Sequence, residues 1–564
     1  SMHALDESHI LLFLLQVSLL LALARAGGLW LYRRGQPAIT AEILVGILMG
    51  PTVFGRLAPA WHARLFPNNP TQQNMLDTVA WLGILLFLLQ SGLETNLVAA
   101  LRQKRDALAI SLSDLLLPIG LMVGLAWLLP SSLHGPAQSR VLFSLLVATI
   151  MTISALPVTA RVLQDLGIYR SDASLLTLCA LTLNDLAGWV VFAVILGYAT
   201  DSAMSLSRIP LLIGATILFT VFCLTAGRRF TDAAIRQLHR WHLPQPGASL
   251  TLICILGMLA GATTIAIGIH ALFGFFMAGI MAGESEHLQE NTREAFSQMV
   301  KAVLVPLFFV SIGLKIDFLS HFNLPLLLFM LLFGVAARFA AAWVGVGLTS
   351  HPRANRHLIA AAHTPGGEMQ IVIGLLALEY GVIAPPVFVA IMGSAVLSSI
   401  TLGPWMRYAL LRSRRAGPIA LLEPRHVVGN LPPTSRDEVI RLLAERVAEG
   451  GLDAQSVAHA VTEREGLMTT ALGDGVAIPH ARLPSLAAPR LAFGRIRPPG
   501  IPWNAPDALP VILVFLLLTP DDDDQSQLII LRTIAKAMSH PTARAALLEA
   551  SEADLHARLT ELLQ

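Results

Sequence analysis

The sequence carries little charge for its length. Only 13% of its 564 residues are Asp, Glu, Lys or Arg, whereas 54% are hydrophobic and the mean hydropathy is +0.65. A soluble domain is nearer one quarter charged, so most of this chain is expected to lie among membrane lipid. The net charge of +2 is too small to favour nucleic acid as a partner, because such binding needs a strongly basic surface.

Cysteine is also scarce. The three cysteines, Cys179, Cys223 and Cys254, all lie in apolar segments. A free cysteine in such a place behaves as a small core residue. This distribution excludes a disulfide framework and a cysteine-based metal site.

Long apolar runs are abundant in the first 411 residues. A run of about 17 or more apolar residues can cross a bilayer as a helix. The eighth and ninth runs meet near Gly268 with hardly any loop, and merging them would leave twelve spans. We predict thirteen spans, at residues 9–32, 38–55, 76–93, 107–129, 141–164, 174–199, 208–227, 248–266, 267–283, 295–314, 322–348, 356–380 and 385–411.

The loops between these spans differ in their basic residues. With the amino terminus outside, ALRQKRD (100–106) and GRRFTDAAIRQLHRWH (227–242) lie in the cytoplasm, whereas GYATDSAMSLS (197–207) lies outside. This asymmetry follows the positive-inside rule. It favours thirteen spans over twelve, because merging two spans would invert every later loop.

Proline and glycine interrupt two of the predicted spans. In the fifth span, Pro157 removes a backbone donor and is expected to free the carbonyl oxygen near Ile153. The break in the twelfth span consists of Thr364, Pro365, Gly366 and Gly367. Spans seven apart run in opposite directions, as in an inverted repeat. Paired broken helices are typical of a transporter site, where open carbonyls and half-helix ends bind ions.

One carboxylate, Asp185, is the only charged side chain between Ser174 and Ala199, and it follows Asn184. Burial disfavours its charged form, and either a proton or a metal cation can neutralise it. A carrier that must hold one or the other before it moves is an antiporter. The alternative is an aspartate that only bonds another helix, although intramembrane carboxylates generally mark functional sites. Ser154, beside the first break, is a further candidate ligand.

Arg338 is a second charge deep in an apolar run. Arginine stays protonated in proteins, so it cannot carry the exchanged proton. We expect it to compensate charge, either by pairing with a helix carboxylate or by bonding Asn184. Asp114 and Glu368 are both candidate partners, and the sequence leaves the choice open.

Five motifs occur together in the membrane half. They are AEILVGILMGPTVFG (41–55), ISALPVTARVLQDLG (153–167), LNDLAGW (183–189), GIHALFGFFMAGIMAG (268–283) and PLFFVSIGLKID (306–317). In type and order they resemble the monovalent cation–proton antiporter superfamily, in the branch of the potassium-efflux antiporters and plant cation/proton exchangers. The resemblance implies an all-α membrane fold of about 13 helices, with an inverted repeat and two crossing broken helices. It also implies a homodimer in which one bundle moves against a dimerisation bundle.

The same resemblance implies residue roles. Asp185 matches the cation- and proton-binding aspartate, and Asn184 stands where electrogenic members have a second aspartate. Arg338 falls where members carry a basic residue facing that pair. This combination implies electroneutral exchange of one proton for one K⁺ or Na⁺, with no cofactor and no metal except the transported cation. The residues around Pro157 depart from the Thr-Asp-Pro break of sodium-type members, which favours K⁺.

The character of the chain changes near Arg415. We divide it into a transmembrane domain (1–411), a linker (412–424) and a cytosolic α/β domain (425–564). VILVFLLL (511–518) is too short to cross a membrane and is rich in β-forming residues, so we interpret it as a buried strand. The acidic run at 521–524 is interpreted as a solvated loop.

The stretch TEREGLMTTALGDGVAIPHAR (462–482) resembles enzyme IIA of the phosphotransferase system, of the fructose, mannitol and nitrogen-regulatory type. The resemblance implies that His480 accepts a phosphoryl group, and that Arg464 or Thr470 binds its oxygens. Gln527 stands where the family usually has a second active-site histidine. The domain is therefore expected either to accept phosphate from a phosphotransferase carrier protein or to bind a small regulatory ligand. Both resemblances together imply a bacterial inner membrane with the tail in the cytoplasm.

Two other readings account for parts of the chain. A phosphotransferase-type sugar permease would explain the tail, but it needs a cysteine-bearing domain, and no cysteine lies outside the predicted spans. A membrane sensor that transports nothing is the other alternative. We expect a regulated secondary transporter rather than an enzyme.

Overall fold

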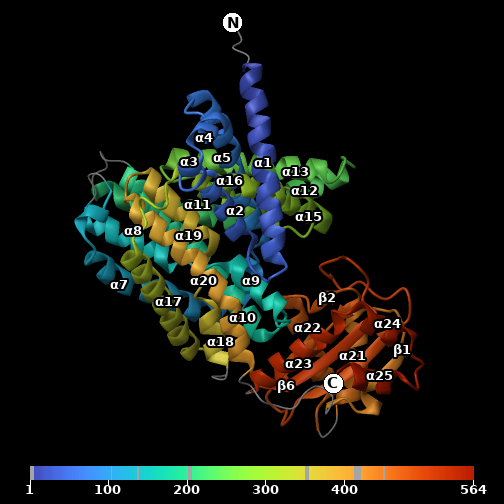
Figure 1. The fold of residues 1–564 in the computed structure, drawn as a ribbon. Helices are drawn as coiled ribbons and strands as arrows, with labels where there is room; N and C mark the ends of the chain where they lie inside the picture. Colours follow the sequence, from blue (N-terminus) through green and yellow to red (C-terminus); the bar gives the residue numbers. More distant parts are fainter. Residues whose placement is uncertain are drawn as a thin grey trace.

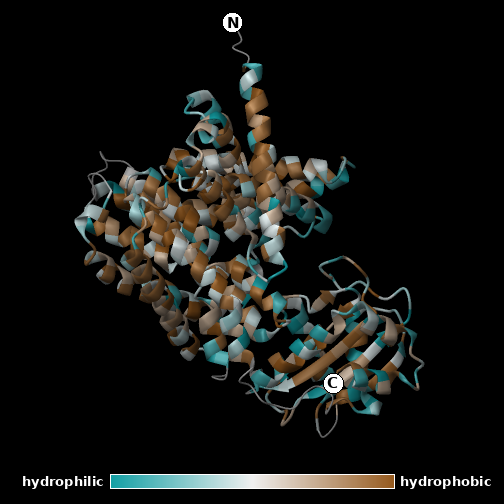
Figure 2. Cartoon of the chain, in the orientation of Figure 1, coloured by the Kyte–Doolittle hydropathy of each residue, from teal (hydrophilic) through white to brown (hydrophobic). Residues whose placement is uncertain are grey.

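The computed structural model describes residues 5–102, 104–135, 139–200, 206–349, 355–411, 421–448, 451–521 and 523–563. A helical membrane half and a C-terminal α/β domain lie against each other (Figure 1). The N-terminal end of α1 and the C-terminal domain are at opposite ends of the molecule. Hydrophobic residues predominate in the membrane half, whereas the C-terminal domain has a hydrophobic central strand and many hydrophilic residues around it (Figure 2).

The membrane half consists of helices α1 to α20. Two short π-helical segments, Cys223–Gly227 and Val300–Leu304, join α11 to α12 and α15 to α16. The helices are α1 (Glu7–Tyr32), α2 (Ala38–Met49), α3 (Phe54–Leu57), α4 (Pro59–Leu65), α5 (Pro70–Glu94), α6 (Leu97–Arg102), α7 (Lys104–Trp127), α8 (Arg140–Thr152), α9 (Leu156–Asp165), α10 (Asp172–Thr200), α11 (Ile209–Phe222), α12 (Arg228–Arg240), α13 (Gly247–Ile267), α14 (Ala271–Gly283), α15 (Glu290–Met299), α16 (Val305–Lys315), α17 (Leu324–Gly347), α18 (Arg356–Ala362), α19 (Gly367–Glu379) and α20 (Pro385–Leu411).

Within the described residues, eleven helical segments are long and apolar enough to cross a membrane. Two more predicted spans correspond to the shorter apolar α14 and to the interrupted pair α18 and α19. The total of thirteen crossings stays a prediction, but the expected separation of the eighth and ninth spans is confirmed. Gly268 ends α13 with a φ of +102°, and the His270 side chain accepts the N–H of Leu272 to start α14.

The membrane helices pack into two bundles. One contains α1, α2, α5, α13, α14 and α16, and the other contains α7 to α10 and α17 to α20. Glycine permits a close approach within the first bundle, because a Cβ on Gly279 of α14 would lie 2.1 Å from the carbonyl oxygen of Leu89 in α5. Small residues at such crossings let membrane helices pack backbone to backbone. The second bundle contains both broken helices.

The C-terminal domain is built around a six-stranded mixed sheet. The strand order is β1-β5-β6-β3-β2, and β4 also pairs with β6. The elements are β1 (Val427–Leu431), α21 (Arg436–Val447), α22 (Ala454–Leu467), β2 (Ala471–Gly473), β3 (Val476–Ala477), β4 (His480–Leu483), β5 (Arg490–Ile496), β6 (Leu513–Pro520), α23 (Asp524–Met538), α24 (Pro541–Glu549) and α25 (Leu555–Leu562).

The central strand β6 is buried at all eight positions, which confirms the predicted buried strand. Two adjustments follow at the edges of the domain. The acidic run is not simply a loop, because Asp523 caps α23 by accepting the N–H of Ser526; Asp522 lies outside the described residues. Leu422, assigned to the linker, already packs in the core of the domain. Linker residues 412–420 lie outside the described residues.

Candidate functional site

The two interrupted helices cross at their breaks. Residues 153–155 separate α8 from α9, and residues 363–366 separate α18 from α19. At the crossing, the backbone N–H of Ala155 donates to the carbonyl oxygen of Pro365 over 2.7 Å. The predicted breaks are therefore confirmed, and the fold brings them into direct contact.

Gly367 permits this close crossing. Its φ is +56°, and a Cβ on it would lie only 2.1 Å from the Cβ of Ala155. Residues with a side chain rarely adopt this left-handed conformation, and two carbon atoms cannot approach so closely. Both the backbone conformation and the space at position 367 therefore require glycine.

Pro157 has a different role from the one expected. It is near the start of α9, where a missing N–H removes no intrahelical hydrogen bond. The carbonyl oxygens that accept side-chain hydrogen bonds at this break belong to Ile150 and Met151, rather than to Ile153 as we expected. Pro157 therefore begins the second half-helix instead of kinking a continuous one.

Arg338, fully buried in α17, connects the two breaks. Its Nε donates to the carbonyl oxygen of Thr364 over 2.8 Å, and its Nη1 donates to that of Met151 over 2.6 Å. These carbonyls lie at the ends of α18 and α8, where the helix dipole is negative. We expected Arg338 to bond Asn184 or a carboxylate such as Asp114. Its hydrogen bonds instead go to backbone carbonyl oxygens of the broken helices. The sequence does not show that these carbonyls lie beside Arg338, because the helices meet only after folding.

Two hydroxyl groups add further links between the breaks. Ser154 Oγ donates to the carbonyl oxygen of His363 over 2.7 Å, and Thr159 Oγ1 donates to that of Ala362 over 2.6 Å. Ser154 thus uses its hydrogen to hold the crossing. Its oxygen retains acceptor capacity, and its role as a cation ligand stays a prediction.

Asp185 and Asn184 lie on α10 beside the crossing. Gly188, one turn after Asp185, faces the first break, because a Cβ on it would lie 3.3 Å from Ile153 Cγ1. Asp185 Oδ1 and both polar atoms of the Asn184 amide are buried without a hydrogen-bond partner among the described residues. Unpaired polar atoms are costly to bury, so this geometry suits a group that receives a proton or a cation.

Three more carboxylates extend this site. Asp114 in α7 is fully buried and acts electrostatically on Arg338 and Asp185. Glu368 interacts electrostatically with both Asp185 and Glu42, a residue of α2. Our sequence reasoning missed Glu42. It could have been found, because Glu42 is the only charged residue in its apolar helix, the criterion that selected Asp185.

Two other polar residues at the crossing were missed. His363 Nδ1 contacts the carbonyl oxygen of Ile359 at 2.7 Å, whereas its Nε2 is buried with no partner in the part of the chain that the structure describes. Gln370 Nε2 donates to the carbonyl oxygen of Ile150 over 3.2 Å. Both lie within four residues of the predicted second break, so proximity to that break was the available signal.

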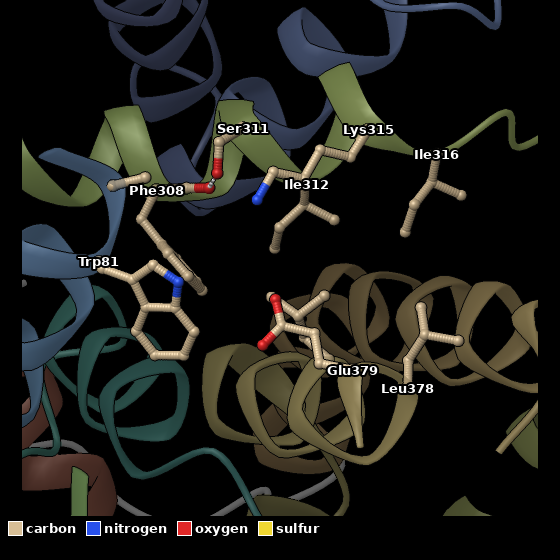
Figure 3. Close-up of a pocket in the computed structure, with 10 residues that line it drawn as sticks. Trp81, Phe308, Ser311, Ile312, Lys315, Ile316, Leu378 and Glu379 are labelled. Carbon is tan, nitrogen blue, oxygen red and sulfur yellow. Dashed lines mark hydrogen bonds between the residues drawn. The ribbon is translucent and has the colours of Figure 1, made fainter. Parts of the chain in front are cut away.

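A small pocket lies between the two bundles (Figure 3). Its volume is about 130 Å³, and it is lined by Ala80, Trp81, Phe308, Ser311, Ile312, Lys315, Ile316, Leu375, Leu378 and Glu379. Trp81 from α5 and Lys315 from α16 face Glu379 from α19 across it. Lys315 Nζ also lies 3.0 Å from Asp77 Oδ1. None of the predicted ion-site residues lines this pocket, which marks a less tightly packed part of the interface between the bundles.

The C-terminal domain has a second polar site around His480, the first residue of β4. The His480 ring is fully buried, and its Nδ1 lies 2.9 Å from the carbonyl oxygen of Ile478. A carbonyl only accepts hydrogen bonds, so Nδ1 carries a hydrogen. When the ring is neutral, Nε2 carries the lone pair that a nucleophile requires. Thr470 donates its hydroxyl hydrogen to Glu465 over 2.5 Å, so this hydroxyl is already engaged within the domain.

A carboxylate of the membrane half, Asp172, lies at the centre of this second site. Arg464 Nε is 2.5 Å from Asp172 Oδ1, and Arg482 Nε is 2.9 Å from Asp172 Oδ2. The Gln527 amide donates to Asp172 Oδ2 over 3.1 Å and accepts the Asp172 N–H over 3.2 Å. His480 Nε2 is 3.4 Å from Asp172 Oδ1. The structure thus brings three predicted tail residues together, and Thr470 is not among the contacts with Asp172.

Asp172 and Arg482 were not predicted. Arg482 follows His480 by two residues on a strand, which places both side chains on one face. Arg482 could therefore have been predicted as a site residue from the sequence. Asp172 begins α10, far away in the sequence, and it reaches the site only because the two domains pack together. No metal-binding group of three or more His, Cys, Asp or Glu side chains is found in the described ranges.

Comparisons with known proteins identify the family of each half of the chain. Residues 17–408 match the family model described as "Sodium/hydrogen exchanger, transmembrane". Residues 420–561 match "Phosphoenolpyruvate-dependent sugar phosphotransferase system, EIIA 2". The two matches adjoin near the predicted linker and together cover most of the chain.

Individual relatives support the membrane match. The chain is 30% identical over 407 residues to the Na(+)/H(+) antiporter NhaS4 of Synechocystis sp., covering 71% of this chain and 97% of that protein. It is 29% identical over 322 residues to K(+)/H(+) antiporter 1 of Saccharomyces cerevisiae, covering 56% of this chain but only 36% of the yeast protein. The sodium proton antiporter MjNhaP1 from Methanocaldococcus jannaschii shares the fold, with a TM-score of 0.55 at 16% identity over 71% of this chain and 99% of that one.

The family match covers both broken helices, Asp185 and Arg338, so it includes the whole site at the helix crossing. Its extent over residues 17–408 is well over half of the chain. We conclude that this protein belongs to the sodium/hydrogen exchanger family of membrane antiporters and carries an EIIA-type domain as its C-terminal tail.

Proposed function

We propose that the protein exchanges a monovalent cation, K⁺ or Na⁺, for a proton by alternating access. The observation that carries the proposal is the position of Asp185. Its Oδ1 is buried and has no hydrogen-bond partner among the described residues, beside two broken helices that cross. Such a carboxylate is unfavourable when charged and empty, so a proton and a cation compete to neutralise it.

We further propose that exchange is electroneutral. Asn184 carries no charge, so Asp185 is the titratable member of the pair. Arg338 stays protonated and donates to backbone carbonyl oxygens at both breaks, which suits a fixed structural charge. One proton exchanged for one monovalent cation moves no net charge across the membrane.

The preferred cation is part of the proposal. The named relatives include a Na⁺/H⁺ antiporter and a K⁺/H⁺ antiporter. We propose K⁺, because the segment 153–167 resembles the broken helix of the plant cation/proton exchangers, and its Ala155, Leu156 and Pro157 depart from the Thr-Asp-Pro sequence of sodium-type members. The sugar-permease alternative loses its support, since the membrane half matches an exchanger family.

The assembly and its control complete the proposal. We propose a homodimer in a bacterial inner membrane, with the amino terminus outside and the tail in the cytoplasm. The start of α1 and the tail lie at opposite ends of the molecule, which supports placing them on opposite sides of the membrane (Figure 1). The tail regulates exchange, with a phosphotransferase carrier protein or a small regulatory ligand as its partner.

The test uses purified protein in liposomes with a luminal pH dye. After a proton gradient is imposed, Na⁺, K⁺, Li⁺ or choline is added, with and without a clamped membrane voltage. We expect K⁺ to drive proton movement faster than Na⁺ does, at a rate that the voltage does not change. Asp185→Asn should reduce this rate to that of protein-free liposomes, because the amide cannot exchange a proton for a cation.

The matched control is Asp165→Asn, which changes an exposed aspartate that pairs with Arg161 at the end of α9. It should exchange like the unmodified protein and elute identically in size-exclusion chromatography. Exchange that persists in Asp185→Asn would refute the assigned ion site. A flat response to every cation that persists in a chain truncated near Arg415 would instead favour a membrane sensor that transports nothing, whereas exchange that appears on truncation would mean that the tail holds the transporter shut.

A further inference from the structure

The contact between Asp172 and the EIIA-type site suggests how the tail regulates exchange. This inference rests on the proposed function. We propose that Asp172 is an intramolecular ligand of this anion site, and that a phosphoryl group on His480 displaces it and releases the tail from the membrane half. The donors around Asp172 come from α22, β4 and α23 of the tail, whereas Asp172 begins α10 of the membrane half.

The donors surrounding Asp172 suit an oxyanion. Arg464 and Arg482 bind different carboxylate oxygens, at 2.5 Å and 2.9 Å. Charged hydrogen bonds of this kind are the strong ones, and arginine binds phosphate and carboxylate groups alike. Arg464 and Asp172 are both buried, with 8% and 9% exposure. Removing Asp172 would leave the arginine charges desolvated in the docked arrangement, so its loss disfavours docking.

Gln527 explains why this domain departs from its family pattern. Its amide nitrogen donates to Asp172 Oδ2, while its amide oxygen accepts the backbone N–H of the same residue. An amide presents a donor and an acceptor side by side, whereas the two nitrogens of an imidazole lie on different edges of the ring. Glutamine at this position therefore binds the first residue of α10 at two points, which suits it to intramolecular docking.

Docking and phosphorylation exclude each other at His480. Its Nε2 lies 3.4 Å from Asp172 Oδ1. A phosphoryl group on Nε2 would have to place phosphorus and three oxygens in that gap. The phosphoryl group would also place a charge of about −2 beside the Asp172 carboxylate, and the two would repel each other. The two arginines can then bind the phosphoryl oxygens only after Asp172 has left.

The docked tail also contacts the helix that carries the ion site. Leu528 of α23 belongs to the same buried hydrophobic cluster as Leu163, Leu166 and Ile168, near the turn between α9 and α10. Asp185 is 13 residues after Asp172 on the same helix, about 20 Å along its axis. A tail that binds the start of α10 restrains the movement of the bundle that contains both broken helices. Release is therefore expected to raise the exchange rate.

The direct test is chemical phosphorylation of the full-length protein with phosphoramidate. In this step the lone pair of Nε2 attacks phosphorus, the Nε2–P bond forms, the phosphoramidate P–N bond breaks, and nitrogen leaves as ammonia. Phosphohistidine at His480 is measured by mass spectrometry. If only the undocked fraction reacts, the labelling rate is scaled by that fraction.

We expect Asp172→Ala to be labelled at least about ten times faster than the unmodified protein, and Asp165→Asn to be labelled at the unmodified rate. Gln527→Ala keeps the carboxylate but loses both amide contacts, so it should be labelled at an intermediate rate. This second variant keeps the test valid if Asp172→Ala folds poorly. In phosphorylated protein, hydrogen exchange at residues 166–172 should accelerate, because the tail no longer covers them.

Equal labelling rates in all these proteins would overturn the proposal, as would unchanged protection of residues 166–172 after phosphorylation. In proteoliposomes, Asp172→Ala should exchange at least about twice as fast as Asp165→Asn, and equal or slower exchange would refute the restraint. Labelling and hydrogen exchange involve no transport. They can succeed even if Asp185→Asn still transports, so failure of this inference is distinguishable from failure of the proposed antiport.

Discussion

Arg338 holds two helix breaks with one side chain. Its planar guanidinium presents several N–H groups in a fixed geometry, and two of these donate to carbonyl oxygens of separate helices. A lysine ammonium is a compact charge on a flexible stem and would not reproduce this fork. The buried carboxylate Asp114 nearby interacts with Arg338 electrostatically, without a hydrogen bond. The arginine therefore positions the backbone beside Asp185 and adds positive charge to the site.

Gly367→Ala should disrupt the crossing of the broken helices. The new Cβ would meet that of Ala155 at 2.1 Å, on a backbone with a φ of +56°. Backbone strain and overpacking together should lower the free energy of unfolding by about 2 to 5 kcal/mol. Thermal unfolding in detergent, followed by size-exclusion fluorescence, measures this change.

Gly214→Ala is the matched control, because Gly214 lies in the helix α11 with no atom within 4 Å of an added Cβ. Its Tm should be unchanged or slightly higher, since alanine favours a helix. The double variant Ala155→Gly with Gly367→Ala removes the clash but keeps the unfavourable φ, so it should recover only part of the loss. Equal Tm values for Gly367→Ala and Gly214→Ala would contradict this account.

At this scale the sequence reveals residues that are unusual for their surroundings. Asp185 is visible as a charge in an apolar run, and His480 is visible in a local motif. The contacts of Arg338 and Asp172 are not visible, because their partners lie on other elements that meet only after folding. A sequence gives the type and burial of a residue far more readily than its partners.

At the scale of elements, the first break depends on contacts across the crossing more than on proline. Pro157 lies near the start of α9, where its ring suits the helix. We expect Pro157→Ala to change the free energy of unfolding by no more than about 1 kcal/mol and to retain exchange. Thermal unfolding and the liposome assay measure both properties.

Arg338→Met provides the contrast for Pro157→Ala. It removes two hydrogen bonds from buried carbonyl oxygens of α8 and the α18–α19 break, and leaves nearby carboxylates without compensation. We expect the free energy of unfolding to fall by about 3 kcal/mol or more. We also expect exchange to be lost. If Pro157→Ala proves as damaging as Arg338→Met, the proline itself holds the break open.

Element boundaries show where sequence patterns are reliable. The break near Gly268 was predicted from the charge of the loops and the strand β6 from a short β-forming run, and the structure contains both. The second span was predicted to reach residue 55, but α2 ends at Met49 because Gly50 adopts an extended backbone before Pro51. Hydropathy measures how long an apolar run is, whereas local backbone chemistry decides where the helix stops.

At the scale of the whole molecule, two membrane bundles meet a tail with its own core through a contact that combines buried charges with apolar packing. The tail core includes the aromatic pair Phe493 and Phe515, whose ring centroids are 4.9 Å apart, on neighbouring strands. Its buried clusters lie on both faces of the sheet. The contact with the membrane half instead centres on Asp172 and the apolar residue Leu528. This division predicts that the tail and the membrane half unfold separately.

We therefore expect two thermal transitions, resolved by hydrogen exchange of tail strands and membrane helices at increasing temperature. Docking stabilises the tail by mass action, as any ligand that binds only the folded state does. Asp172→Ala should consequently lower the tail midpoint by about 4 °C for each kcal/mol of docking free energy lost, and leave the membrane midpoint unchanged. Asp165→Asn should move neither midpoint. A single transition shared by both halves, or equal shifts in both, would mean that the domains form one cooperative unit, and release of the tail would then require unfolding rather than undocking.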